Sequence, residues 1–138
     1  MTSTMLLAPI ALLAAVGFAR ADVFPFDTPS GNIYCTAGIG GITDVGCTIY
    51  EHSGQPLGAA PTCARSQSLS VMMRETGRVT AQCGRERRGQ RPSGLEAMPY
   101  GHREDFGGIV CTSQREGFRC TNRDGHGFFL SRGRQEVF

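Results

Sequence analysis

Residues 111–120 read C-T-S-Q-R-E-G-F-R-C, in which two short β-type runs flank the polar turn Gln114–Gly117. A two- or four-residue loop at the centre of this turn brings Cys111 opposite Cys120. With the two-residue loop, the two cysteines form a non-hydrogen-bonded pair, in which side chains approach each other most closely, as a disulfide requires. The stretch therefore predicts a β-hairpin that is closed by a disulfide bond.

The same geometry relates two of the other four cysteines. Cys35 and Cys47 are equidistant from Gly41, so a hairpin with an odd-numbered loop places them opposite each other. Among the fifteen pairings that six cysteines allow, Cys63 and Cys83 then remain as the third pair by elimination. A zinc or redox site of the C-x-x-C type is disfavoured, because no two cysteines have that spacing.

An apolar leader precedes the first cysteine. It runs from Met5 to Phe18, which is shorter than the span of about 20 residues that crosses a membrane, and ends in Ala19-Arg20-Ala21, a cleavage-type sequence. We expect residues 1–21 to be a signal peptide and residues 22–138 to be a single secreted or periplasmic β domain, with no membrane span after cleavage. Six cysteines in a small exported chain indicate a disulfide framework. A buried N-terminal helix is the alternative, since residues 1–5 contain no lysine or arginine.

Short β-type runs separated by glycine-rich turns make up most of the remaining chain. The run Ser68–Arg74 alternates, with Leu69, Val71 and Met73 on one face. No amphipathic stretch of helix length follows the leader. We therefore expect an all-β fold, a small disulfide-stapled antiparallel sheet, sandwich or partial barrel of about 6–8 short strands. The segments that carry the pattern are 32–37, 45–51, 68–74, 78–83, 109–113, 118–122 and 126–131.

Two stretches of sequence carry a resemblance to a known family. One is Phe26–Cys35, F-D-T-P-S-G-N-I-Y-C, and the other combines Cys111, Gly117, Cys120 and Asn122 with the ending G-H-G-F at residues 125–128. With Met98–Gly101 between them, they resemble a bacterial family of small exported proteins known only as a domain of unknown function. The resemblance covers nearly all of residues 22–138. It implies secretion and a compact cysteine-bridged domain, and it implies no activity and no catalytic residues.

The basic residues are all arginines and are nearly balanced by acids. The whole chain has a formal charge of +2, and removal of the leader with Arg20 leaves +1, which argues against a nucleic-acid binder. The segment 85–91, R-E-R-R-G-Q-R, nevertheless has a local charge of +3. We expect it to lie in an exposed loop, residues 84–98, where it is either solvated surface or a contact for an anionic envelope component or an acidic protein. The candidate anion-binding residues are Arg85, Arg87, Arg88 and Arg91.

No sequence motif marks an active site. His52, His102 and His126 are isolated from one another, so we expect no metal and no cofactor, and no serine lies in a G-x-S-x-G motif. We expect a non-enzymatic binding module of the cell envelope, in which His126, between two glycines, is structural. The alternative is a small envelope hydrolase that uses His126 or His102 with a nearby carboxylate. Three tyrosines could stack on a sugar or be ordinary strand residues: Tyr34, Tyr50 and Tyr100.

Overall fold

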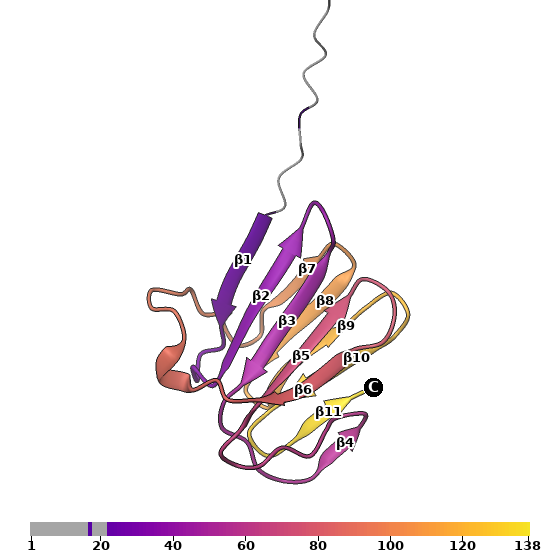
Figure 1. The fold of residues 1–138 in the computed structure, drawn as a ribbon. Coiled ribbons are helices and arrows are strands. Elements are labelled where there is room, and N and C mark those ends of the chain that lie inside the picture. The colour runs from indigo at the N-terminus through magenta and orange to yellow at the C-terminus, as the bar shows by residue number, and fades with distance from the viewer. Residues whose placement is uncertain (1–16, 18–21) are drawn as a thin grey trace, which may run out of the picture.

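The chain folds into two stacked β-sheets, seen in a computed structural model that describes Gly17 and residues 22–138 (Figure 1). The five-stranded sheet contains, in spatial order, β1 (Asp22–Asp27), β2 (Ile33–Ile39), β3 (Asp44–Ile49), β5 (Ser68–Arg74) and β6 (Thr80–Gly84). The six-stranded sheet contains β4 (Pro56–Gly58), β11 (Gln135–Val137), β10 (Gly127–Leu130), β9 (Gly117–Thr121), β8 (Ile109–Gln114) and β7 (Arg103–Phe106). The expected all-β fold is confirmed, as a sandwich. The expected signal peptide lies, apart from Gly17, outside the described residues.

The expected number of about 6–8 strands was too low, because four strands lack a clear apolar alternation. β1 contains Pro25, which a sheet tolerates at an edge because proline has no N–H to donate. β7 reads R-E-D-F, and β4 and β11 have three residues each. The pair β4–β11 is also parallel, whereas the other neighbouring strands are antiparallel. Across residues 22–138, no helix is long and apolar enough to cross a membrane.

The core lies between the two sheets. In β5 the expected alternation is confirmed: Leu69, Val71 and Met73 are buried. Aromatic rings join the sheets, since Phe26 of β1 stacks on Phe106 of β7 with centroids 5.7 Å apart. The inward-facing side chains of both sheets thus bury apolar surface away from water. This burial is the main contribution to the stability of the folded domain.

The structure contains all three predicted disulfides, the two that rest on hairpin register and the third that follows by elimination. Cys35–Cys47 joins β2 to β3, and Cys111–Cys120 joins β8 to β9; both pairs are buried and face each other directly in register, with Cα atoms 4.1 Å apart. The third bridge, Cys63–Cys83, ties the segment before β5 to β6. Two bridges therefore strengthen hairpins within a sheet, and the third fixes a loop at a sheet edge.

The expected loop at residues 84–98 is largely exposed but is attached at its far end. It contains the 3₁₀ helix η1 (Arg88–Gln90) and passes beside β1 (Figure 1). There Met98 N donates to the Asp27 carbonyl at 2.8 Å, and Asp27 N donates to the Glu96 carbonyl. The Met98 side chain is buried in the core. The arginine-rich segment is thus held between the end of β6 and the edge of β1.

Candidate functional site

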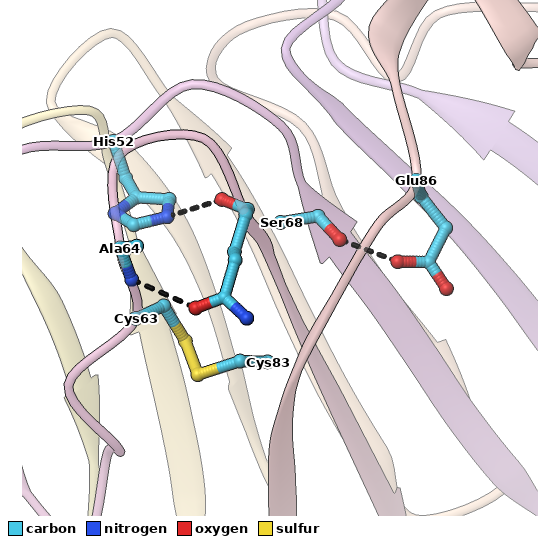
Figure 2. The surroundings of a disulfide bond; sticks show 7 residues. His52, Cys63, Ala64, Ser68, Cys83 and Glu86 are labelled. Carbon is cyan, nitrogen blue, oxygen red and sulfur yellow. Dashed lines mark hydrogen bonds between the residues drawn. A yellow bond between two sulfur atoms is a disulfide. The ribbon is translucent and has the colours of Figure 1, made fainter.

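The chain continues beyond β6 with Glu86 facing the sheet. The Ser68 hydroxyl of β5 donates a hydrogen bond to the Glu86 carboxylate, and Figure 2 shows the two side chains directed at each other. Gly84 leaves space for this contact, because a Cβ atom there would lie 2.1 Å from Glu86 Oε2. Since side chains alternate along an extended chain, Arg85 and Arg87 point to the side opposite Glu86.

A fixed turn lies beside this segment, on the other side of the Cys63–Cys83 disulfide (Figure 2). Gln67 N donates to the Ala64 carbonyl and Ala64 N donates to Gln67 Oε1, each at 2.9 Å. His52 Nε2 lies 2.7 Å from the Gln67 carbonyl oxygen. The disulfide and these hydrogen bonds hold the turn Ala64–Gln67 against β6.

Between the turn and the arginines lies a hollow of about 660 Å³. Both arginines are exposed. In the part of the chain that the structure describes, neither Arg85 nor Arg87 forms an ion pair. The hollow therefore presents two guanidinium groups that can accept an external anion. Its lining residues are Ala64, Ser66, Gln67, Arg85 and Arg87.

The other two candidate arginines have partners within the protein. Arg91 Nη1 lies 2.5 Å from Asp27 Oδ2 and donates to the Gly31 carbonyl at 3.3 Å. Only 12% of the Asp27 side chain is exposed, so this pair is partly buried. Arg88 Nη1 lies 3.6 Å from Glu51 Oε2. Arg91 is therefore held within the protein, and among the four candidate arginines the charge without an acidic partner in residues 22–138 is on Arg85 and Arg87.

Two titratable groups near this segment have shifted pKa values. The hydrogen bond from Ser68 lowers the pKa of the Glu86 carboxyl, with help from the backbone N–H groups of Glu86 and Arg85, because these donors favour the charged form. Burial raises the pKa of the Tyr50 hydroxyl. Glu86 is therefore a carboxylate and Tyr50 a neutral phenol at neutral pH.

Glu86→Gln is expected to lower the free energy of unfolding at pH 7 by about 0.5 kcal/mol, a small value because the carboxylate is solvent-exposed. The lowered folded-state pKa makes this contribution complete above the ordinary value of 4.5, and it disappears as the pH falls through the folded-state pKa. Urea denaturation from pH 7 to pH 2 measures the difference from wild type. Glu116→Gln, the same change in the exposed turn of the last cysteine hairpin, is the control and should leave the free energy of unfolding at pH 7 nearly unchanged. A difference that persists unchanged at the acidic end contradicts the assignment.

His102 does have a carboxylate nearby, as the hydrolase alternative requires. Its Nε2 lies 2.7 Å from Glu104 Oε2 in a groove of about 400 Å³ between β1 and β7, which Glu96 and Asp105 also line. Nearly half of each side chain is exposed, 48% for His102 and 47% for Glu104. None of the described residues that line this groove is a serine, threonine or cysteine. Among the described lining residues, the pair therefore has no hydroxyl or thiol nucleophile beside it, and carboxylates are the nucleophilic side chains within reach.

His126 takes part in a turn through its backbone. Its N–H donates to Asn122 Oδ1 at 3.1 Å, and Asn122 N donates to the His126 carbonyl at 2.9 Å. Asn122 Nδ2 also donates to the carbonyls of Arg74 and Gly77, so this buried amide clamps the β9–β10 turn to the β5–β6 turn. In residues 22–138 the imidazole makes no hydrogen bond, and no three potential ligands gather as a metal site. A structural role for the imidazole stays a prediction.

The three tyrosines have different surroundings. Tyr34 lines a groove on the outer face of the five-stranded sheet, whereas Tyr50 is buried. The guanidinium of Arg115 lies over the Tyr100 ring, 5.3 Å from its centroid. Of the three, Tyr34 is the one that a ligand on the sheet could contact.

Sequence reasoning missed Ser66 and Gln67 as neighbours of the arginines. They are polar loop residues that a disulfide brings into place, and no local pattern marks them. The position of Glu86 opposite the two arginines did have a signal, because the alternation R-E-R in an extended segment puts the acid on one side and both bases on the other.

No curated protein and no solved structure matches the chain. Residues 4–138 match the family model described as a family of unknown function, DUF6636. Since this match covers nearly the whole sequence, the chain belongs to the DUF6636 family.

Proposed function

We propose that residues 22–138 form a secreted or periplasmic binding module that recognises an anionic component of the cell envelope through Arg85 and Arg87. Three disulfides support an oxidising compartment, extracellular or periplasmic. The observation that carries the binding role is the hollow at the Cys63–Cys83 bridge, where two guanidinium groups lack an acidic partner in the described structure.

The base of this hollow is already rigid before a ligand arrives. The Cys63–Cys83 bridge joins its two walls, and the Ser68–Glu86 contact fixes the segment from which the arginines project. Because little backbone entropy is lost on binding, even exposed charges can contribute to affinity.

The spacing of the two arginines favours a polymer over a single small anion. Arg85 and Arg87 are two residues apart in an extended segment, so their Cα atoms are about 7 Å apart. Each guanidinium group can therefore bind a different anionic group of the ligand. Guanidinium groups bind carboxylate or phosphate oxygens through paired hydrogen bonds, and the Ser66 hydroxyl adds a further donor at the rim. We therefore infer a ligand with repeated carboxylate or phosphate groups.

Arg85→Gln/Arg87→Gln is expected to weaken binding of polyphosphate or poly-glutamate about tenfold at low ionic strength, from two exposed contacts of about 0.7 kcal/mol each. Isothermal titration at increasing salt measures the affinity, and wild-type binding should weaken with salt more steeply than binding by the variant. The folded state should be unaffected, because neither side chain has an ion-pair partner in residues 22–138.

The matched control is Arg74→Gln/Arg78→Gln, which removes the same charge at the opposite end of β5 and β6. It should leave the affinity within about twofold of wild type. Equal weakening by both double variants would show that only net charge matters and would contradict the proposed site. Wild-type protein that binds neither polymer would contradict the proposed ligand class.

A further inference from the structure

The outer face of the five-stranded sheet carries two rows of side chains that run across its strands. The register aligns one row across β2, β3, β5 and β6, consisting of Tyr34, Thr48, Ser70 and Gln82. The next row, two residues along each strand, consists of Thr36, Gly46, Met72 and Thr80. The residues between the rows, such as Cys35 and Val71, point into the core. The two rows therefore form one continuous surface that is separate from the arginine hollow.

This surface is grooved. A cavity of about 330 Å³ lies over the two rows, close to the lower limit of ordinary small-ligand sites. Gly46 has no side chain, which lets Met72 lie against the sheet: a Cβ at position 46 would be 2.9 Å from Met72 Cε. The flexible, half-exposed Met72 side chain and the Tyr34 ring provide apolar contact surface in an otherwise polar groove.

No charged side chain is among the described residues that line this groove. The outer face of the six-stranded sheet differs, because the hollow there is lined by Arg103, Asp105, Arg119 and Arg123. Without a positively charged side chain, the groove cannot offset the cost of removing a phosphate or carboxylate from water. Without an acidic side chain, it cannot offset that cost for an amine. The chemistry of the surface therefore favours an uncharged ligand.

The polar groups of the groove both donate and accept hydrogen bonds. Thr48 and Ser70 hydroxyls bond to each other at 2.7 Å, and Thr80 Oγ1 donates to the Met72 carbonyl at 3.4 Å. The side chains of Thr36 and Gln82 make no hydrogen bond to other described residues of the chain. Hydroxyls and amides can match a ligand whose own hydroxyls donate and accept, and the ring carbons of a sugar can pack on Tyr34 and Met72.

We propose that this groove binds a neutral oligosaccharide segment across β2, β3, β5 and β6. The ligand class follows from three features together: a concave floor, bifunctional hydrogen-bonding groups without charge, and apolar walls for the faces of sugar rings. The inference does not depend on the proposed anion site, which uses different residues and a different ligand.

The test is NMR titration of wild-type protein with four neutral hexasaccharides, namely maltohexaose, cellohexaose, mannohexaose and chitohexaose. At least one should shift amide resonances of residues 34–36, 46–48, 70–72 and 80–82 at millimolar concentration. Oligogalacturonate, which carries a carboxylate on each ring, should shift them less. If no neutral hexasaccharide produces shifts, or if the shifts map elsewhere on the protein, the proposal is wrong.

Thr36→Val/Gln82→Met should weaken binding of the responding hexasaccharide about tenfold, because it removes two hydrogen-bonding groups and keeps side-chain size and strand propensity. The control is Thr112→Val, the same kind of change on the outer hollow of the other sheet, which should leave the affinity unchanged. Unchanged binding by the groove variant, or equal weakening by the control, overturns the assignment. If the variant fails to fold, the wild-type shift map alone decides.

Discussion

Replacing Cys63 and Cys83 together by serine is expected to lower the free energy of unfolding by about 3 kcal/mol. This bridge closes the longest of the three disulfide loops, with a sequence separation of 20 against 12 and 9. Loss of the crosslink therefore returns the most conformational entropy to the unfolded chain. Both cysteines are partly exposed, so the new hydroxyls can remain hydrated. Urea denaturation followed by circular dichroism measures the effect.

The control for this variant is Ser66→Ala, which lies in the same turn and leaves the crosslink intact. It should change stability by less than about 0.5 kcal/mol, as surface substitutions usually do. A loss of less than about 1 kcal/mol in the double serine variant would show that the turn is fixed by its hydrogen bonds alone and would contradict the role given to the bridge.

Phe118→Ala is expected to cost about 3–5 kcal/mol, because it leaves a cavity in the centre of the core. Phe118 is 1% exposed, and its ring lies 5.8 Å from Phe26 of the opposite sheet and 6.5 Å from Phe128. The substitution thus removes contacts both within the six-stranded sheet and across the sandwich. Thermal and urea denaturation should both report the loss.

Phe24→Ala provides the matched comparison, since Phe24 lies in the edge strand β1 and its side chain is 46% exposed. Its removal should cost less than about 1 kcal/mol, since a surface side chain leaves no cavity. If the two alanine variants were equally stable, the sheets would not be packed through Phe118, and the described core would be wrong.

The hairpins could be predicted from sequence because their determinants are local. Around Cys111 and Cys120 a two-residue turn fixes the register, and the observed pairing of Gln114 with Gly117 follows from it. In Ser68–Arg74 the apolar residues Leu69, Val71 and Met73, each two positions apart, fix which face is buried. Both signals lie within a few residues of the elements that they specify.

The stacking of the sheets and the strands at their margins could not be predicted in the same way. β4 pairs with β11, which is far away along the sequence. Each of the two strands has three residues, too few to show an alternation of apolar and polar side chains. Pro25 interrupts the pattern of β1, and β7 is mostly charged, so the pairing with neighbouring strands and the core contacts of Phe26 and Phe106 reveal them as strands.

The candidate site was predictable in composition but not in detail. The excess of positive charge at residues 85–91 is visible in the sequence. Which of these arginines are paired within the protein depends on Asp27 and Glu51, which are far away along the chain. Arg91 is therefore structural and Arg85 is free for reasons that only the fold reveals. The uncharged groove on the five-stranded sheet was likewise invisible, because it needs four strands in register.

The order of the disulfides along the chain has a consequence for oxidative folding. The first cysteine bonds to the second, the third to the fourth and the fifth to the sixth, so no bridge encloses or crosses another. Each bridge closes a short loop, for which the entropic cost of bringing the ends together is small. If the chain becomes available from its N-terminus onward, each bridge can form as soon as its second cysteine is exposed. No bridge has to wait for a later segment of the chain. Oxidation in this order needs no rearrangement of earlier bonds, which spares the protein the slow thiol–disulfide exchange that interleaved bridges require.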